Sequence, residues 1–361
     1  SPAEFVLDAV HLVRDNPRFE GPVTWLGLWH SNYWGGFANA GLWRPLTLTL
    51  FRFEHEVLGF GDNPAGYFVI NLLLHSGVVL LLWRIALQFL PERAWAFWVA
   101  GVYAVHPVAS DVVPNVAGRA DLLAALAVLG SVLLWLRFRS TGGRYWFLAV
   151  CLVWIAGLLA KENAVVAPAL ILAIELTRRW KGGDPEGAGQ TWWPFLVLAL
   201  IGVGWWSYRS HVLAEFGDSF QAAVNNPLLL VDVPTRMMNS VVLVARYLLQ
   251  SFYPWPLLAD YSHATLHIVE SVFDPRVLLA LIALGGAVVG SFLLGRNRPA
   301  AIIGFLGFLI TMAPVANLFI GIGAIRADRF LYLPLAWVLL AFAAFVSMAF
   351  HKLQGLSLIH I

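Results

Sequence analysis

The chain has 361 residues, of which 60% are hydrophobic and only 12% are charged, with a net charge of +2 and a mean hydropathy of +0.74. A soluble globular domain carries about 25% charged residues, so this composition indicates a polytopic membrane protein. The basic residues are spread in pairs and form no contiguous patch, which argues against nucleic-acid binding. The single cysteine, Cys151, lies in an apolar run, so we expect neither a disulfide framework nor a cysteine-based metal site.

Residues 1–63 are mixed in polarity and are expected to form a first loop that contains Asp8 in a short polar segment. No apolar span precedes this loop, so we expect a first transmembrane helix to be missing upstream. Residues 42–60 are expected to form an amphipathic helix lying in the membrane interface. Its apolar residues are Trp43, Leu46, Leu50, Phe53 and Leu58, and its charged residues are Arg44, Arg52, Glu54 and Glu56.

An all-α bundle of about nine transmembrane helices is expected after this loop, since a bilayer requires about 20 apolar residues for each crossing. The apolar segments are about 64–90, 94–109, 121–139, 145–160, 164–177, 192–210, 276–294, 299–316 and 331–350. We divide the chain into a first loop, a bundle at 64–210, a loop at 211–275, further spans at 276–352, and a tail at 353–361 that continues no pattern and need not be native. Within the second loop, 237–253 is short and interrupted by polar residues, so an interfacial or re-entrant segment is expected.

The lysines and arginines of the short loops favour one orientation, because cytoplasmic loops are enriched in these residues. The cytoplasmic set is Arg93, Arg137, Arg139, Arg144, Arg178, Arg179, Lys181, Arg296, Arg298 and Lys352, provided that 237–253 does not cross. The opposite face then receives Asp8, Asp111, Arg119, Asp121, Lys161, Glu162, Arg236, Asp260, Arg326, Asp328 and Arg329. This second set contains the groups that catalysis would need.

Several of these polar residues have a purely structural alternative. Asp8 is explained more simply as a solvated loop carboxylate, and His106 with Asp111 equally well as the cap of a helix end at Pro107. Asn71 and His75 are four residues apart, which favours hydrogen bonds between packed helices.

The remaining candidates are charged. Lys161 and Glu162 are adjacent between two short apolar segments, where they could simply neutralise each other. Arg326 and Arg329 are three residues apart on one helix face and suit a phosphate, although interfacial snorkelling is the simpler alternative.

Eight segments together resemble the TMTC family of transmembrane and tetratricopeptide-repeat O-mannosyltransferases, which have a GT-C type membrane fold. They are FVLDAVHLVRDNP near the start, WRPLTLTLFR, NLLLH at 71–75, HPVASDVVPNVAGRADLLA at 106–124, LAKEN at 159–163, NNPL at 225–228, LLADYS at 257–262, and NLFIGIGAIRADRFLYLP at 317–334. The most specific are GRADLLA and ADRFLYLP, in this order. Two departures are that Ala9 replaces the second residue of the family's Asp-Asp pair, and that nothing after Lys352 could form a 34-residue repeat.

The resemblance implies an integral, multi-pass enzyme that transfers a sugar, mannose in this family, from a polyprenyl or dolichyl phosphate to Ser or Thr hydroxyls of an acceptor protein, with inversion. The reaction would occur on the non-cytoplasmic face, which is the endoplasmic reticulum lumen or the outer side of the bacterial inner membrane. Asp8 would be the general base. The donor phosphate would be bound by Arg326, Arg329 and then Arg119, while His106, Asp111, Asp121, Glu162 and Asp328 would orient sugar hydroxyls or a divalent metal.

Two alternatives stay open. A flippase or transporter of lipid-linked sugars would use the same charged residues as a translocation path, and would then place them at mid-membrane depth on several helices. A catalytically impaired membrane scaffold is the other, because Ala9 removes half of the acidic pair. No ligand cluster in the sequence specifies a metal.

Overall fold

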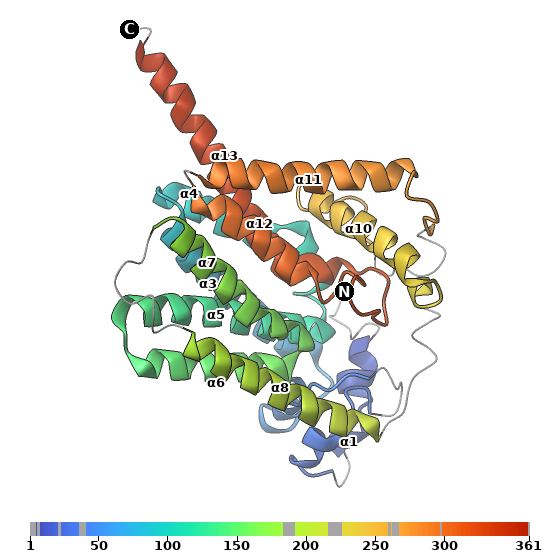
Figure 1. Ribbon diagram of the computed structural model, residues 1–361. Coiled ribbons are helices and arrows are strands. Elements are labelled where there is room, and N and C mark those ends of the chain that lie inside the picture. Colours follow the sequence, from blue (N-terminus) through green and yellow to red (C-terminus); the bar gives the residue numbers. More distant parts are fainter. Residues whose placement is uncertain are drawn as a thin grey trace.

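The computed structural model describes residues 5, 8–20, 23–35, 41–182, 192–215, 226–258, 261, 267–296 and 298–359. Over these ranges the chain is helical without strands, which confirms the predicted all-α class. The α-helices are α1 (Pro17–Glu20), α2 (Pro45–Arg52), α3 (Pro64–Phe89), α4 (Arg93–Val105), α5 (Arg119–Thr141), α6 (Arg144–Ala160), α7 (Ala167–Trp180), α8 (Trp193–Ala214), α10 (Val233–Gln250), α11 (Pro275–Gly295), α12 (Pro299–Met312) and α13 (Tyr332–Ile359), as Figure 1 shows.

The helices begin and end where local chemistry requires it. The side chains of Asn63, Asp232 and Asp274 accept backbone N–H groups at the starts of α3, α10 and α11, and a proline follows within the first two positions of each helix. Gly142 ends α5 with a φ of +70°, a left-handed conformation that favours glycine. The short loop after Gly142 turns the chain directly back into α6.

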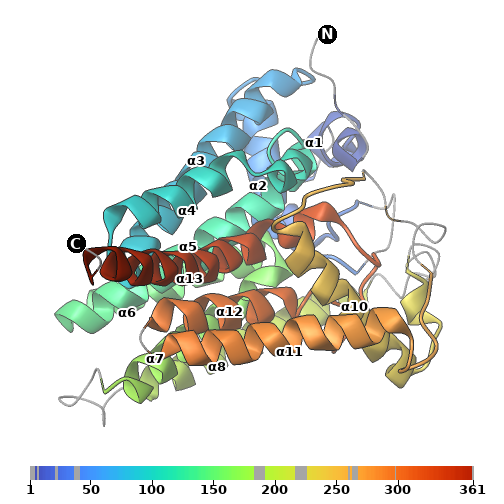
Figure 2. The same ribbon diagram turned by 90° about the horizontal axis from the view of Figure 1, so that it is seen from above.

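Neighbouring helices pack in the order α6, α5, α3, α4, α13, α12, α11 and α10, with α7 against α5 and α12, and α8 against α6. Figure 2 shows this arrangement from above, with α11 and α8 on the side away from α3 and α4. Gly304 and Gly307 allow α12 to approach α13 closely, since an added Cβ at either position would meet Trp337 or Ala341 within 3 Å. Trp337 is consequently almost completely buried.

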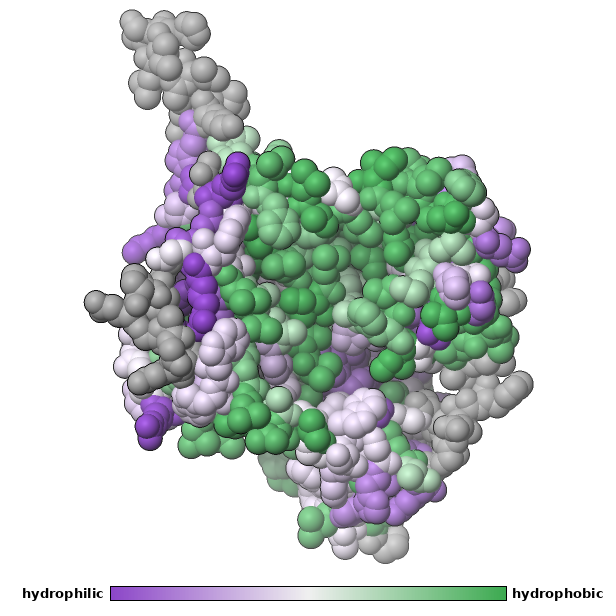
Figure 3. Space-filling view, in the orientation of Figure 1, coloured by the Kyte–Doolittle hydropathy of each residue, from purple (hydrophilic) through white to green (hydrophobic). Residues whose placement is uncertain are grey.

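Four helical stretches of the described chain are long and apolar enough to cross a membrane: Pro64–Phe89, Val116–Thr141, Pro275–Gly295 and Asp328–His351. Arg144–Ala160 and Pro299–Met312 are apolar but shorter. The predicted total of about nine crossings therefore stays a prediction beyond these four. Figure 3 shows a broad hydrophobic surface over α11 and α12, flanked by hydrophilic patches, and α11 exposes residues such as Leu279, Ile282 and Leu293. A surface of this kind suits contact with lipid.

The predicted interfacial helix at 42–60 is divided into α2 and the π-helical turn η3 (Phe53–Val57). Most of its charged side is the buried side: Arg44, Arg52 and Glu54 are less than 10% exposed, whereas Phe53 and Leu58 are exposed. Arg44 and Glu54 turn inward because their ion-pair partners, Glu162 and Arg119, belong to the bundle. Arg52 instead pairs with Glu56 of the same segment. The amphipathic pattern is therefore present, with much of its polar face against the protein rather than against water.

The segment predicted at 237–253 is α10, a single helix of 18 residues. Its last residue, Gln250, donates to Asp328 at 2.6 Å, close to the start of α13. It is not among the stretches that are long and apolar enough to cross. Its interfacial or re-entrant placement stays a prediction, as do the domain boundaries given above.

Candidate active site

The charged residues of the bundle gather at its two ends. At one end Arg139 pairs with Glu175 at 3.3 Å, His351 contacts Glu92, and Lys181 contacts the carbonyl of Arg296. At the other end lie three ion pairs, Arg44 with Glu162, Lys161 with Asp121, and Arg119 with Glu54. The sequence-predicted site residues that the structure describes belong to this second end, where α4 and α6 finish and α5 and α13 begin.

Arg44 and Glu162 form a two-point ion pair between the first loop and the segment after α6. The two nitrogen–oxygen distances are 3.0 Å and 2.5 Å. Burial by itself would raise the pKa of Glu162, but the charge and hydrogen bonds of Arg44 outweigh it and lower that pKa to about 2. Glu162 is therefore ionised and committed to Arg44.

Lys161 and Asp121 form a second buried pair, with the Lys161 Nζ 2.6 Å from Asp121 Oδ1. Lys161 is 4% exposed and Asp121 is 8% exposed. Burial lowers the pKa of Lys161, while the neighbouring Asp121 works in the opposite direction. The lysine and its neighbour Glu162 thus have separate partners and do not neutralise each other.

Arg119 is completely buried, and its guanidinium is bound on several sides. It pairs with Glu54, donates to Asn71 Oδ1 at 2.5 Å, and donates to the carbonyl of Tyr67 at 3.0 Å. This arrangement leaves it no open side for a ligand, so we replace the expected phosphate-binding role by a structural one. The sequence could not show this because Glu54 and Asn71 are distant along the chain.

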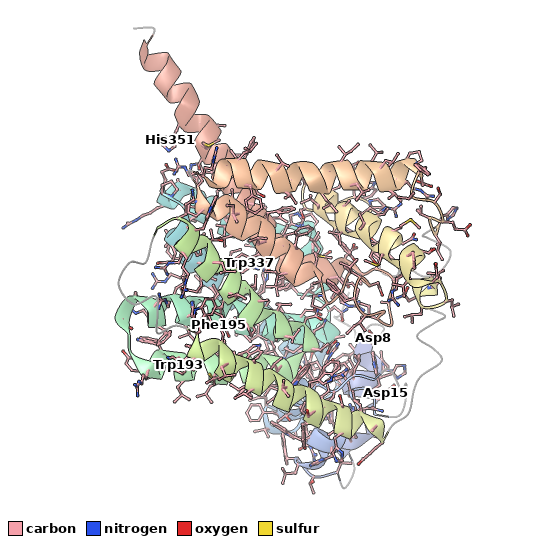
Figure 4. All side chains as sticks on the ribbon, viewed as in Figure 1. Asp8, Asp15, Trp193, Phe195, Trp337 and His351 are labelled. Atoms are coloured by element: carbon pink, nitrogen blue, oxygen red, sulfur yellow. The ribbon has the colours of Figure 1, made fainter. Side chains whose placement is uncertain are left out.

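Asp8 is half-buried at the start of the helical turn that continues as η1 (Val10–Arg14). It is close to the buried Tyr33: burial raises the pKa of that tyrosine to about 12, and the charges of Arg44, Asp8 and Asp121 all act on it. Figure 4 labels Asp8 where the N-terminal segment meets the rest of the bundle, with Asp15 farther out. Asp8 therefore lies beside the buried charge network without an ion pair to any described residue.

A small pocket joins this network to the C-terminal part of the chain. Asp121 and Arg329 both line it, together with Asn163, Thr311 and Tyr332. The backbone N–H of Arg329 donates to Asp111 Oδ2 at 2.9 Å, and its guanidinium lies 3.9 Å from the same oxygen. Burial raises the pKa of Asp111, an effect that Arg329 partly offsets. Arg329 is thus the residue that links Asp111 to the pocket lined by Asp121.

Arg326 is held on the neighbouring side of this end. Its guanidinium donates to Gln250 Oε1 at 2.9 Å and lies 4.3 Å from the ring centre of Tyr261. Asp328 is buried and accepts hydrogen bonds from Gln250, from the backbone of Leu258 and from the Tyr261 hydroxyl. Asp328 therefore fixes the two residues that position Arg326, and both of its carboxylate oxygens already accept hydrogen bonds from the protein.

The backbone before Arg326 is fixed by two asparagines. Asn226 donates to Asn317 Oδ1 and to the carbonyl of Ile322, both at 2.7 Å. Asn317 has a φ of +58° and donates back to the carbonyls of Ala324 and Ile325 at 3.3 Å. Neither asparagine was predicted as a site residue, although NNPL and LLADYS were the segments that could have pointed to Asn226 and Tyr261.

His106, Asn71 and His75 have structural partners. His106 caps the 3-10 turn η4 (Pro107–Asp111) and contacts the carbonyl of Ser251 at 3.3 Å. Asn71 donates to two backbone carbonyls, and His75 contacts the Tyr332 hydroxyl at 2.7 Å. The favoured interpretation of Asn71 and His75 as links between helices agrees with these contacts. His106 is held in the same way, so its expected contact with sugar is not needed to explain it.

No group of three or more His, Cys, Asp or Glu side chains among the described residues is arranged to hold a metal ion.

These features define a polytopic helical membrane protein with a charged site at one end of its bundle. Residues 218–288 match the family model described as "Protein O-mannosyl-transferase TMTC, DUF1736". The predicted resemblance of this chain to the TMTC family is therefore confirmed, as the relatives below also show.

Similar proteins carry the name protein O-mannosyl-transferase. The human TMTC4 protein is 29% identical over 92% of this chain and 51% of its own length. The Caenorhabditis elegans protein F38B6.6 is 24% identical over 97% of this chain and 49% of its own. Drosophila melanogaster Tmtc2 is 32% identical over 76% of this chain and 30% of its own. The chain thus spans about half the length, or less, of these relatives, and no solved structure matches it.

Proposed function

We propose that this chain is the membrane-embedded catalytic portion of a glycosyltransferase. It would move a sugar, most simply mannose, from a polyprenyl or dolichyl phosphate to Ser or Thr hydroxyls of a protein. The observation that carries the proposal is that Asp121 and Arg329, from opposite halves of the sequence, line one pocket at the end of the bundle where Asp8 lies. The names of the relatives support the choice of reaction.

In this proposal Asp8 takes the proton from the acceptor hydroxyl as that oxygen attacks the anomeric carbon of the donor. The bond to the lipid phosphate breaks in the same step, so the configuration inverts. Arg329 and Arg326 stabilise the phosphate as it gains charge. Asp111 and Asp121 have carboxylates near Arg329 and orient the sugar hydroxyls, whereas Glu162 and Asp328 hold Arg44 and Arg326 in place.

We assign this end of the bundle to the non-cytoplasmic face. The opposite end carries Arg137, Arg139 and Arg144 at the α5–α6 turn and Arg178, Arg179 and Lys181 at the end of α7, as cytoplasmic loops commonly do. The lipid donor would keep its tail in the bilayer and present its phosphate at the depth of these helix ends. The compartment would be the endoplasmic reticulum lumen or the outer side of a bacterial inner membrane.

The positions of the buried charges favour transfer over transport. Arg119 and Asp121 are in the first turn of α5, Lys161 directly follows α6, and Asp328 precedes α13. A translocation path would need such groups in the middle of several helices. Charges at helix ends instead suit chemistry at the membrane surface.

The test is transfer of labelled mannose from a polyprenyl phosphate to a Ser- and Thr-containing peptide by the purified membrane protein. Asp8→Asn should lower kcat by roughly 100-fold to 10,000-fold, the usual contribution of a general base. Asp15→Asn is the matched control, because Asp15 is exposed and paired with Arg14 at 2.7 Å. Full activity of Asp8→Asn would refute the assignment of the base, and movement of intact donor across a vesicle membrane without transfer would favour the flippase.

A further inference from the structure

A second pocket lies beside Arg326, between α10 and residues 267–269. Its lining is largely aliphatic and includes Val242 and Leu243 of α10 and Ile325. The polar residues in its wall are Asn239, Arg246 and His267. The amide of Asn239 is already occupied by Thr235 and by both backbone groups of Val269. Arg246 is therefore the cationic group that an anion in this pocket would meet.

Arg246 lacks a carboxylate partner within the described part of the chain, and no hydrogen bond from its guanidinium is found there. Ile325, the residue directly before Arg326, lines the same pocket, so Arg326 lies at its edge. Burial lowers the pKa of Arg246, and the positive charges of Arg326 and Arg276 lower it further. Arg276 is neutralised by Asp274 at 2.8 Å, whereas the partners of Arg326 in the described chain, the Gln250 amide and the Tyr261 ring, carry no charge. Half-buried cations without a counter-ion are unfavourable, and an anion would relieve that cost.

The aliphatic wall indicates that the anion belongs to a lipid. A free phosphate gains nothing from Val242, Leu243 and Ile325, whereas the first carbons of a lipid chain would remove these side chains from water. The pocket is also next to α11, because Val242 packs with Val277 and Ala280 of that helix, whose outer face is exposed and apolar. A lipid could therefore enter from the bilayer with its head group at the arginines.

We propose that the α10 pocket binds the phosphate group of a membrane lipid through Arg246 and Arg326, with the adjoining lipid carbons against Val242, Leu243 and Ile325. The shared chemistry is a phosphate attached to an apolar chain. Its source is either the polyprenyl phosphate carrier or a bilayer phospholipid. The proposal rests on the proposed function only in the choice of a polyprenyl phosphate as the first probe.

The experiment measures binding directly, by native mass spectrometry of the purified protein in detergent with a short polyprenyl phosphate. Arg246→Gln should weaken binding by about tenfold, the effect of losing one charge-assisted hydrogen-bonded contact. Arg246→Lys, which keeps the charge, should lose less. Arg93→Gln at the start of α4 is the control, because Arg93 is exposed and lies in the cytoplasmic set. Unchanged binding by Arg246→Gln would overturn the proposal.

Three further probes separate the sources. Inorganic phosphate should bind far more weakly than the lipid, and the uncharged polyprenol should also bind weakly; equal binding of either probe would overturn the proposal. Phosphatidic acid that displaces the polyprenyl phosphate would support the site and identify a general phospholipid, whereas failure to displace it would support the site and identify the carrier. Asp8→Asn should bind like the unaltered protein, so a failure of catalysis and a failure of this site are distinguishable.

Discussion

Two groups of cations lie at the same end of the bundle and differ in how deeply they are buried and in whether a carboxylate pairs with them. In the first, Arg44, Arg119 and Lys161 are each less than 10% exposed, and each has a carboxylate partner in Glu162, Glu54 and Asp121. In the second, Arg246, Arg326 and Arg329 are partly exposed, and within the described chain only Arg329 forms an ion pair, at 3.9 Å from Asp111.

This difference separates structure from ligand binding. A fully buried charge is tolerated when a partner of opposite sign and hydrogen bonds compensate for the lost water, so the first group fixes the first loop against α5 and α6. A partly exposed cation with a long ion pair, as in Arg329, or with none, as in Arg246 and Arg326, keeps its capacity to bind an added anion. The first group therefore stabilises the fold around the site, and the second group is the one that we propose for a lipid phosphate.

Breaking a matched pair should have the largest effect. Arg119→Gln leaves Glu54 buried without its counter-charge, and removing one partner of a buried pair costs about 3–5 kcal/mol. We expect a large fall in the melting temperature of the detergent-solubilised protein and a loss of monodisperse material on size exclusion. Arg14→Gln is the control, since its partner Asp15 is exposed, and no measurable change is expected. A stable Arg119→Gln variant with impaired donor binding would contradict the structural role.

The contribution of the Arg44–Glu162 pair to stability should depend on pH. The pKa of Glu162 is about 2 in the folded chain against an ordinary value of 4.5, so the pair stabilises the fold fully above pH 4.5 and loses that contribution as pH falls through about 2. The shift corresponds to a free energy on the order of 3 kcal/mol. Glu162→Gln lacks this contribution, so its melting temperature should be lower than that of the unaltered protein at pH 6. The two values should converge towards pH 2, and a difference that does not depend on pH would contradict the ion-pair explanation.

The sequence predicted the long apolar helices well, but it did not predict which carboxylate pairs with which arginine. Apolar length located α3, α5, α11 and α13 because hydropathy is a local property of the chain. The same local reasoning grouped Arg119 with Arg326 and Arg329 as cations on one face. It could not distinguish them, because their difference depends on whether a carboxylate from a distant segment, such as Glu54, folds against the guanidinium.

The position of Ala9 shows the same limit. In the sequence Ala9 occupies the second position of the family's acidic pair, directly after Asp8. In the structure Ala9 is 1% exposed and belongs to an apolar cluster with Leu12 and Val13. Neighbouring residues in a helical turn point in different directions, and a sequence motif does not show which of them faces the protein interior. The position of Ala9 next to Asp8 therefore did not reveal that Ala9 is buried.

Placing an acid without an ion-pair partner at position 9 tests whether this position is buried. Ala9→Asp should destabilise the protein by about 1–3 kcal/mol, because a buried polar group without a partner loses its hydration. Thermal unfolding in detergent would measure the change, with the smaller polar variant Ala9→Ser as control. A variant with higher transferase activity and an unchanged melting temperature would show instead that the acid reaches the site, as the family's paired acids imply.

The smallest effect is expected at Asp328, a carboxylate that contacts Arg326 only indirectly, through Gln250 and Tyr261. Asp328→Asn keeps the size of the side chain but loses the charge that accepts from Gln250 and Tyr261, so Arg326 should be held less firmly. Because each net hydrogen bond contributes about 0.5–1.5 kcal/mol, the donor KM should rise roughly threefold to tenfold with little change in kcat.

Steady-state kinetics with varied donor would separate the two roles of Asp328. Asp232→Asn is a suitable control, since Asp232 caps α10 through Thr235 and asparagine caps a helix as well as aspartate does. A fall in kcat at constant KM would mean that Asp328 contacts the reacting sugar, as the sequence first indicated. In that case Gln250 and Tyr261 would position Arg326 without help from Asp328. Asp328 would then be a substrate-contacting residue and not a support for a cation that lacks an ion-pair partner.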